Sequence, residues 1–379
     1  VVALLGPELE VPPTAEPDAV LSGLAAVGAG GTSYSPRGVE SFEQVAYALA
    51  AQALSLEAIR ARLVPCTPSE SVDSACAEAV LSPLARRAWR RPPLPEEIDG
   101  LVGVSMEAAK ALGSFDGGLE FGIAAILQSP HFLYRTELGA TDGGLRRFTD
   151  HELAMRLSFL LWNGPPDEAL LAAADAGALT TDDGLALQAE RLLADDRARA
   201  GLRRFFTEWL QLSGLTSLSK DPTIFDFYTN ELGESAREET LRLLEWMVFD
   251  EGRDLRTLMT TTTTFVSPLL AALYDIPAPS ADDGFVRVQL PQDGHRAGLL
   301  GHASFLNQHA HAVSTSVTLR GKAVRSILLC QAMPDPPVNV DTSIPEPSGD
   351  APTMRERVAE HLTDPGCAGC HLLMDPIGL

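Results

Sequence analysis

A helical apolar repeat recurs along most of this 379-residue chain and constrains its fold more than any other feature. Between Gly38 and Leu63, apolar side chains fall three or four residues apart and form one stripe of a helix: Phe42, Val45, Ala46, Leu49 and Ala53. Similar patterns cover residues 75–89, 117–127, 149–215 and 232–247. We therefore expect a mainly α protein made of multi-helix bundle domains.

Helix start and stop signals agree with this pattern. The pair Pro92-Pro93 ends the helix predicted before it, and Pro95 with two following acids begins the next one. Thr149 and Glu152 have the spacing of a capping box, which predicts a helix start at that point.

The pattern changes after Met259. Consecutive threonines, Phe265 and Val266 favour extended chain, and FVRVQL alternates like a strand, so we expect a small β element. Residues 331–350 are rich in proline and predict an extended linker to a last helix over 353–361.

The length exceeds that of a typical single domain, so we expect several structural units. We divide the chain into an N-terminal helical domain, a central helical domain, a mixed domain with short strands and the proline-rich linker, and the start of a c-type haem-binding segment. Their ranges are 1–140, 141–258, 259–350 and 351–379.

Composition excludes several classes of protein. Hydrophobic residues make up 45% of the chain, which is typical of a globular protein, and 51 acidic against 29 basic residues give a formal charge of -22. Such a surface repels nucleic acid. No apolar stretch approaches the roughly 18 residues of a membrane-spanning helix. Neither terminus carries a start or closing signal, so we expect a longer precursor.

The sequence PGCAGCH near the carboxyl end carries the main chemical hypothesis. Cys367 and Cys370 lie three positions apart and His371 follows at once, which is the attachment pattern of c-type haem. On a helical turn both sulfurs face one side and can add to the two vinyl groups, with His371 as the proximal iron ligand. The alternatives are a Cys367–Cys370 disulfide, half of a zinc site, and a chance match.

A bound iron would have a second axial position, and the sequence offers six candidates for it: His361, Met374, Met354, His302, His309 and His311. Met374 is too close to His371 to reach the opposite face easily. His361 precedes the motif by ten residues and can fold back, although it can equally be a residue at a helix end.

His309 and His311 form an H-x-H pair. In a strand both imidazoles point the same way and can hold copper, zinc or iron, whereas in a helix they cannot. Ordinary loop histidines are the simpler interpretation. A nearby polar group has the composition of an anion or propionate pocket, or of a helix cap: Ser314, Thr315, Ser316, Arg320 and Lys322.

Five cysteines indicate an oxidising compartment. Cys66 and Cys76 bracket the loop CTPSESVDSAC, whose length suits a disulfide rather than two buried thiols. Cys330 is interpreted as an apolar core residue at a helix end, with a bond to a cysteine outside this sequence as the alternative.

Two charged groups are expected at the surface. One is a basic patch formed by Arg86, Arg87, Arg90 and Arg91, with salt bridges to Glu or Asp within the fold as the alternative. The other is the run Glu238-Glu239 with Glu245, which has the composition of an acid–base pair but the pattern of a solvated helix face. Motifs of serine hydrolases, zinc proteases, phosphate loops and dinucleotide sites do not occur.

Many segments together resemble a family of secreted proteins from planctomycetes and myxobacteria, which consist of adjoining domains of unknown function associated with planctomycete-type cytochrome c domains. These segments include VVALLGPELEVP, ARRAWRRPPLPEE, SPHFLYRTEL, LAMRLSFLLWNGPPDEALLAAADAGAL, TSVTLRGKAVRSILLCQAMPDPP and RERVAEHLTDPGCAGCHLLMDPIGL. The resemblance covers nearly the whole chain. It implies an exported protein with a lipoprotein anchor as one option, in the periplasm, at the outer membrane or outside the cell.

These observations predict an exported c-type haem protein that transfers electrons or performs haem-based redox chemistry, with a redox protein or a small molecule as partner. One alternative is a non-catalytic extracellular scaffold or binding module with structural disulfides. Another is an enzyme that uses a metal bound at His309 and His311.

Overall fold

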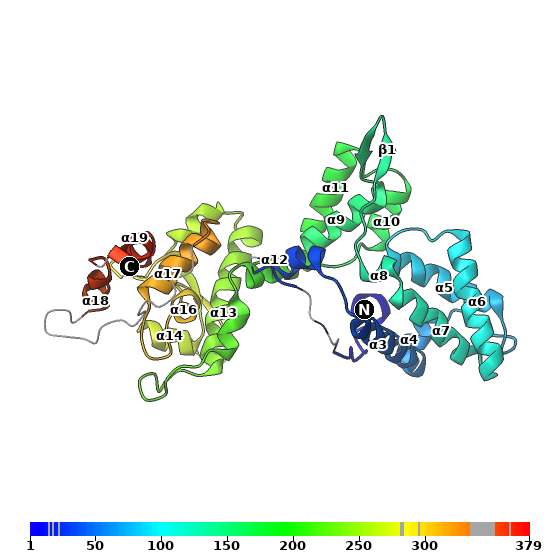
Figure 1. Ribbon diagram of the computed structural model, residues 1–379, viewed down its shortest axis with the longest axis horizontal. Helices are drawn as coiled ribbons and strands as arrows, with labels where there is room; N and C mark the ends of the chain where they lie inside the picture. Colours follow the sequence, from blue (N-terminus) through cyan, green and yellow to red (C-terminus); the bar gives the residue numbers. More distant parts are fainter. Residues whose placement is uncertain are drawn as a thin grey trace. The chain divides into compact units, whose positions relative to one another are not determined.

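The computed structural model describes residues 1–13, 16, 19–21, 23–280, 284–294, 296–333, 353–363 and 365–379. The protein is mainly helical, which confirms the predicted fold class. Two compact units, Val1–Leu202 and Arg203–Leu379, divide the chain (Figure 1). The boundary falls within α12 (Asp196–Trp209). The finer division into four domains stays a prediction, and most of the expected linker lies outside the described residues.

The first unit is built from helices and one small hairpin. Its helices before that hairpin are α1 (Val2–Leu5), α2 (Ala25–Gly28), η1 (Ala29–Gly31), α3 (Pro36–Ser55), α4 (Glu57–Leu63), α5 (Ser74–Trp89), α6 (Pro95–Leu112), α7 (Phe115–Gln128) and α8 (Pro130–Leu133). The hairpin strands are β1 (Ala140–Asp142) and β2 (Leu145–Arg147), and the helices after it are α9 (Asp150–Trp162), α10 (Glu168–Asp175) and α11 (Asp182–Leu193).

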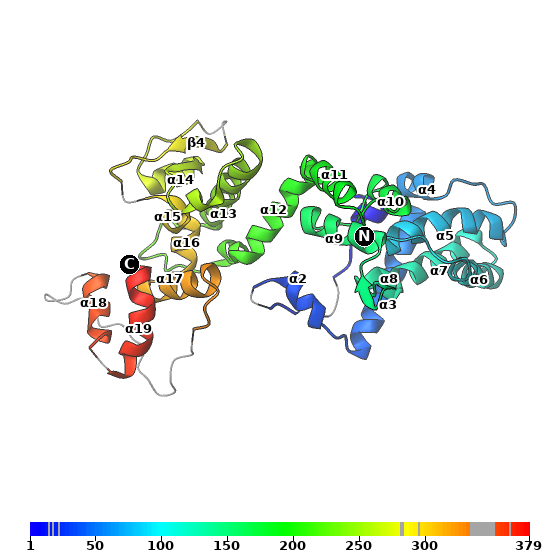
Figure 2. The same cartoon turned by 90° about the horizontal axis from the view of Figure 1, so that it is seen from above.

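Helices α3, α5, α6 and α7 pack together around the main core of this unit (Figure 2). Fully buried side chains from three of them meet there, among them Leu49, Leu81, Leu84, Leu119 and Ile123. The apolar stripe expected over 38–63 therefore faces the core, as the spacing predicted.

Local signals explain where these helices begin. The side chains of Ser35 and Asp73 accept hydrogen bonds from main-chain N–H groups of the first turns of α3 and α5. Thr149 and Glu152 form the expected capping box at the start of α9. The β1–β2 hairpin was not predicted, although Gly143 and Gly144 at its turn both have positive φ, which such turns require.

The second unit surrounds α13 (Asn230–Glu245). The elements before the last two helices are η2 (Leu212–Ser217), η3 (Trp246–Asp250), η4 (Leu255–Met259), β3 (Thr263–Val266), α14 (Pro268–Tyr274), β4 (Val286–Gln289), α15 (Gly298–Gly301), α16 (Ala303–Gln308), α17 (Val317–Ala323) and η6 (Val324–Leu328). The chain ends in α18 (Met354–His361) and α19 (Pro365–Gly378).

The expected β element is the antiparallel pair β3–β4, in which Phe265 lies opposite Arg287. Strand β3 and helices α14 and α16 pack against α13. After β4, the chain breaks at His302 between α15 and α16, and α17 continues into the π-helical turn η6.

Candidate functional site

Helix α19 carries the CxxCH motif. Residues three apart lie on the same face of a helix, so Cys367 and Cys370 share one face of α19, as the sequence predicted. Both are partly exposed free thiols, and the structure forms no disulfide between them. The two sulfur atoms are therefore in the chemical state that thioether formation requires.

His371 is oriented by a buried carboxylate on the next turn. Its Nδ1 lies 2.7 Å from Asp375 Oδ2, and Asp375 is only 1% exposed. The hydroxyl of Thr318 on α17 donates to the other carboxylate oxygen, Asp375 Oδ1, over 2.8 Å. A carboxylate at Nδ1 favours the tautomer with the proton there, which makes Nε2 the nitrogen that carries the lone pair.

Close packing fixes α19 against α17 (Figure 2). A Cβ placed on Gly321 would lie 1.9 Å from the main-chain oxygen of Met374, and one on Gly378 would lie 2.0 Å from that of Val317. Only glycine allows the two backbones to approach so closely. Arg320 adds a hydrogen bond of 2.8 Å from its Nε to the Gly378 carbonyl. The motif thus lies on a helix that the unit holds firmly.

The candidates for a second axial ligand lie in different environments. Met374 is buried on α19 itself, and Met354 begins α18, which packs against α19. His361 ends α18, but its side chain lies outside the described part of the structure. His302 is buried, with Nδ1 3.0 Å from Thr240 Oγ1.

His309 and His311 flank a single β-bridge residue, Ala310, rather than lying in a strand or helix. The His309 ring packs edge-on against Phe305 at 4.8 Å, and burial lowers the pKa of His309 to about 4. His311 is exposed. Within the described ranges, no group of three or more His, Cys, Asp or Glu side chains is arranged to hold a metal ion.

The polar group after this pair mostly stabilises local structure. Ser316 caps α17 by accepting from the Leu319 N–H, and Arg320 contacts Thr315 as well as the end of α19. The helix-cap interpretation of the serine is therefore confirmed.

A buried polar network around α13 was missed. Glu239 is fully buried rather than solvated, and its carboxylate accepts from Thr264 Oγ1 at 2.7 Å and Tyr274 OH at 2.6 Å. Burial together with this carboxylate raises the pKa of Tyr274 well above its usual value. His302 Nε2 lies 3.9 Å from Glu239 Oε1. The network joins α13, β3, α14 and the α15–α16 break, so it determines how these elements pack.

The other three cysteines are one disulfide-bonded pair and one free thiol. Cys66 and Cys76 form the predicted disulfide, with a Cα–Cα distance of 5.8 Å. Cys330 is an exposed free thiol with φ of 52°, not the apolar core residue expected from the sequence. Among the described helices, none is long and apolar enough to cross a membrane.

Three protein families account for most of the chain. Residues 76–137 match PSD5, a protein of unknown function (DUF1595), and residues 148–276 match PSD4, a protein of unknown function (DUF1592). Residues 296–379, which include the CxxCH motif, match PSCyt3, a protein of unknown function (DUF1588).

The chain belongs to the proteins that carry these three domains next to one another, an arrangement associated with planctomycete-type cytochrome c domains. This confirms the family resemblance found in the sequence. No curated protein and no solved structure matches the chain.

Proposed function

We propose that this protein is an exported c-type haem protein that transfers electrons or carries out redox chemistry at the haem iron. The observation that carries the proposal is the combination on α19 of two free thiols on one face with a histidine whose Nδ1 is held by buried Asp375. The cytochrome-related name of the family that matches residues 296–379 supports it.

The residues present fit a covalently attached haem. Cys367 and Cys370 would each add their S–H across one vinyl group, and His371 Nε2 would ligate the iron. The bound haem would supply a one-electron iron couple. Asp375 would orient the imidazole, and Thr318 would hold the carboxylate in place. His361 would be a candidate for a second ligand to the iron.

The disulfide between Cys66 and Cys76 supports location in an oxidising compartment. We therefore place the protein in the periplasm, at the outer membrane or outside the cell, with lipoprotein anchoring as one route. Its partner would be a redox protein or a small-molecule substrate. The charge of -22 favours a partner with a basic contact surface.

Expression with export and haem-attachment machinery tests this function. After dithionite reduction, the protein should show sharp Soret and α bands, and the haem should stay with the polypeptide after acid–acetone extraction. Cys367→Ser and Cys370→Ser should each weaken attachment, and the double variant should abolish it. Cys330→Ser is the matched control and should retain full haem content, because Cys330 lies outside the motif.

Two outcomes would reject the proposal. A spectrum without haem bands, from protein in which the Cys66–Cys76 disulfide shows correct export, would favour the scaffold or binding module. A stoichiometric copper, zinc or iron content without haem that is lost in His309→Asn would favour the H-x-H metal enzyme.

A further inference from the structure

The first unit contains a cavity of about 920 Å³ that is separate from the CxxCH helix. Residues from α1, α5, the α8 region, α9 and the loop that follows α9 line it. Its volume is within the range of small-molecule sites. Four arginines lie in its wall, although the protein as a whole is strongly acidic.

Arg90 is the most unusual of these arginines. The sequence pattern predicted a solvated residue, but Arg90 is only 7% exposed. Its guanidinium donates to main-chain carbonyls, including His131 at 2.6 Å and Tyr134 at 2.9 Å, and its buried Nε has no acceptor in the described structure. Burial lowers the pKa of Arg90 to about 10, which leaves it charged at neutral pH. A buried cation with only carbonyl partners is costly unless an anion neutralises it.

Arg135 adds a second positive charge at the same place. It repels Arg90 strongly enough to contribute to the lowered pKa of Arg90, and its guanidinium stacks on the Phe159 ring at 4.7 Å. Arg87 also lines the cavity. Within the described residues, no carboxylate lies at ion-pair distance from Arg87, Arg90 or Arg135. An anion that contacts both Arg90 and Arg135 would offset the repulsion between them and could accept charge-assisted hydrogen bonds from both.

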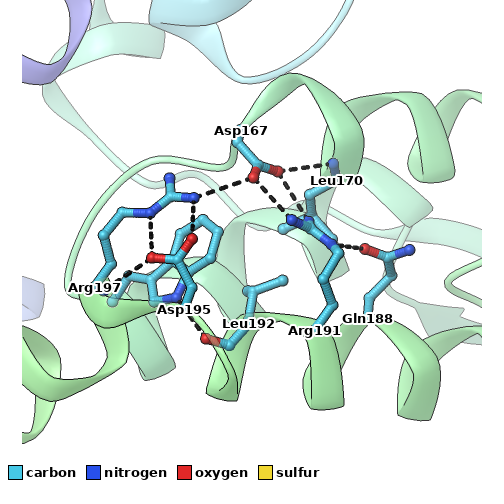
Figure 3. A network of polar contacts seen from close by, with 8 residues as sticks. Asp167, Leu170, Gln188, Arg191, Leu192, Asp195 and Arg197 are labelled. Atoms are coloured by element: carbon cyan, nitrogen blue, oxygen red, sulfur yellow. Dashed lines mark hydrogen bonds and ion pairs between the residues drawn. The ribbon is translucent and has the colours of Figure 1, made fainter.

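The two carboxylates in the wall are already paired. Asp167 accepts from Arg191 at 2.9 Å and from Arg197 at 3.3 Å (Figure 3). Arg197 lies over the Trp162 ring at 3.5 Å, and Glu168 lies 4.0 Å from Arg86. Among the described residues, these pairings leave Arg87, Arg90 and Arg135 without a carboxylate partner; Arg87 and Arg135 are exposed, and Arg90 is the buried one of the three. Phe159 and Trp162 add aromatic surface to the same wall.

We propose that this cavity binds a small organic anion whose carboxylate, sulfonate or phosphate group contacts Arg90 and Arg135 and whose apolar body contacts Phe159 and Trp162. A bidentate guanidinium contact suits these oxyanions, and the aromatic walls would bury the rest of the molecule. The site does not depend on haem attachment, since it lies wholly within Val1–Leu202.

A pair of fluorescent probes tests the proposal on the full chain. 1-Anilinonaphthalene-8-sulfonate is a naphthalene that carries one sulfonate and one anilino group. N-phenyl-1-naphthylamine is the same molecule without the sulfonate and is neutral. We expect saturable 1:1 binding of the sulfonate and much weaker binding of the neutral analogue. Arg135→Gln should weaken sulfonate binding by roughly tenfold or more, because a charge-assisted contact is lost. Arg135 is chosen because Arg90 also supports the fold through its carbonyl contacts.

Arg146→Gln is the matched control. It removes one positive charge from exposed strand β2 of the same unit and should leave the affinity unchanged. Circular dichroism should show that both variants are folded. Displacement by 1-naphthoate or by 1-naphthyl phosphate then distinguishes a carboxylate ligand from a phosphate ester. The proposal is wrong if the sulfonate fails to bind, if the neutral probe binds as tightly, or if Arg135→Gln and Arg146→Gln behave alike.

Discussion

At the scale of single residues, burial decides what each charged side chain does. Glu239 and Arg90 belong to runs that look solvated in sequence, yet both are almost completely buried. Glu239 joins Thr264 and Tyr274, whereas Arg90 joins carbonyls beside a cavity. A charged run therefore contributes to a structural network in one unit and to a candidate anion site in the other.

Glu97 gives a prediction about pH at this scale. Hydrogen bonds from Arg91 are the largest cause that lowers the pKa of Glu97 to about 2, and the Leu94 N–H donates to the same carboxylate. A carboxyl group with a lowered folded-state pKa stabilises the fold above its unfolded pKa near 4.5, and that stability is lost as the pH falls towards 2. Between pH 5 and pH 3 we expect Glu97 to account for a loss of about 1 to 2 kcal/mol.

Urea unfolding at pH 5 and pH 3 measures this loss. Glu97→Gln should be less stable than the wild type at pH 5, and the difference should shrink at pH 3. Glu96→Gln removes an exposed carboxylate from the same helical turn and should keep the pH dependence of the wild type. An unchanged pH dependence in Glu97→Gln would show that this ion pair contributes nothing.

At the scale of elements, the contact between α17 and α19 determines where the CxxCH motif lies. Two glycines bring the backbones together, and the Thr318–Asp375–His371 chain of hydrogen bonds crosses the contact. Helix α17 therefore helps to orient His371 through Thr318 and Asp375, although Cys367, Cys370 and His371 all lie on α19.

Replacing Gly321 tests this contact. In Gly321→Ala, the new Cβ would overlap the main-chain oxygen of Met374, so α19 must shift and the second unit should lose roughly 1–3 kcal/mol. Gly369→Ala is the control on α19 itself, because no described atom beyond its chain neighbours and the backbone of its own helix lies within 4 Å of its Cβ position. It should be neutral or slightly stabilising, since alanine favours helix more than glycine does. Thermal unfolding compares the two, and equal melting temperatures would contradict the close contact.

At the scale of the whole molecule, each unit buries its own core. The first core gathers residues of α3 to α7, and the second gathers residues around α13, β3 and α14. Since the residues of each of these two cores come from a single unit, we expect cooperative unfolding to be a property of the unit rather than of the chain.

Calorimetry should therefore resolve two transitions, each sensitive to changes in its own unit. The double change Cys66→Ser and Cys76→Ser should lower the melting temperature of the first unit only. The matching loss in its free energy of unfolding should be about 2 to 3 kcal/mol. Tyr274→Phe removes the hydroxyl between Glu239 and the Ala303 N–H. It should lower the free energy of unfolding of the second unit only, by roughly 1–3 kcal/mol. A single transition that both variants shift would contradict independent cores.

The sequence by itself determined the helices, most of their starts, the β3–β4 pair, the Cys66–Cys76 bond and the helical CxxCH face. These features depend on spacing, capping and chain separation within a few tens of residues, which local patterns encode. Only the tertiary structure decided that Glu239 and Arg90 are buried and that Asp375 meets both His371 and Thr318. It also decided that three arginines line a cavity where no described carboxylate pairs with them. The reason is that burial and charge pairing depend on which elements pack against each other, and residues that are distant in sequence supply those contacts.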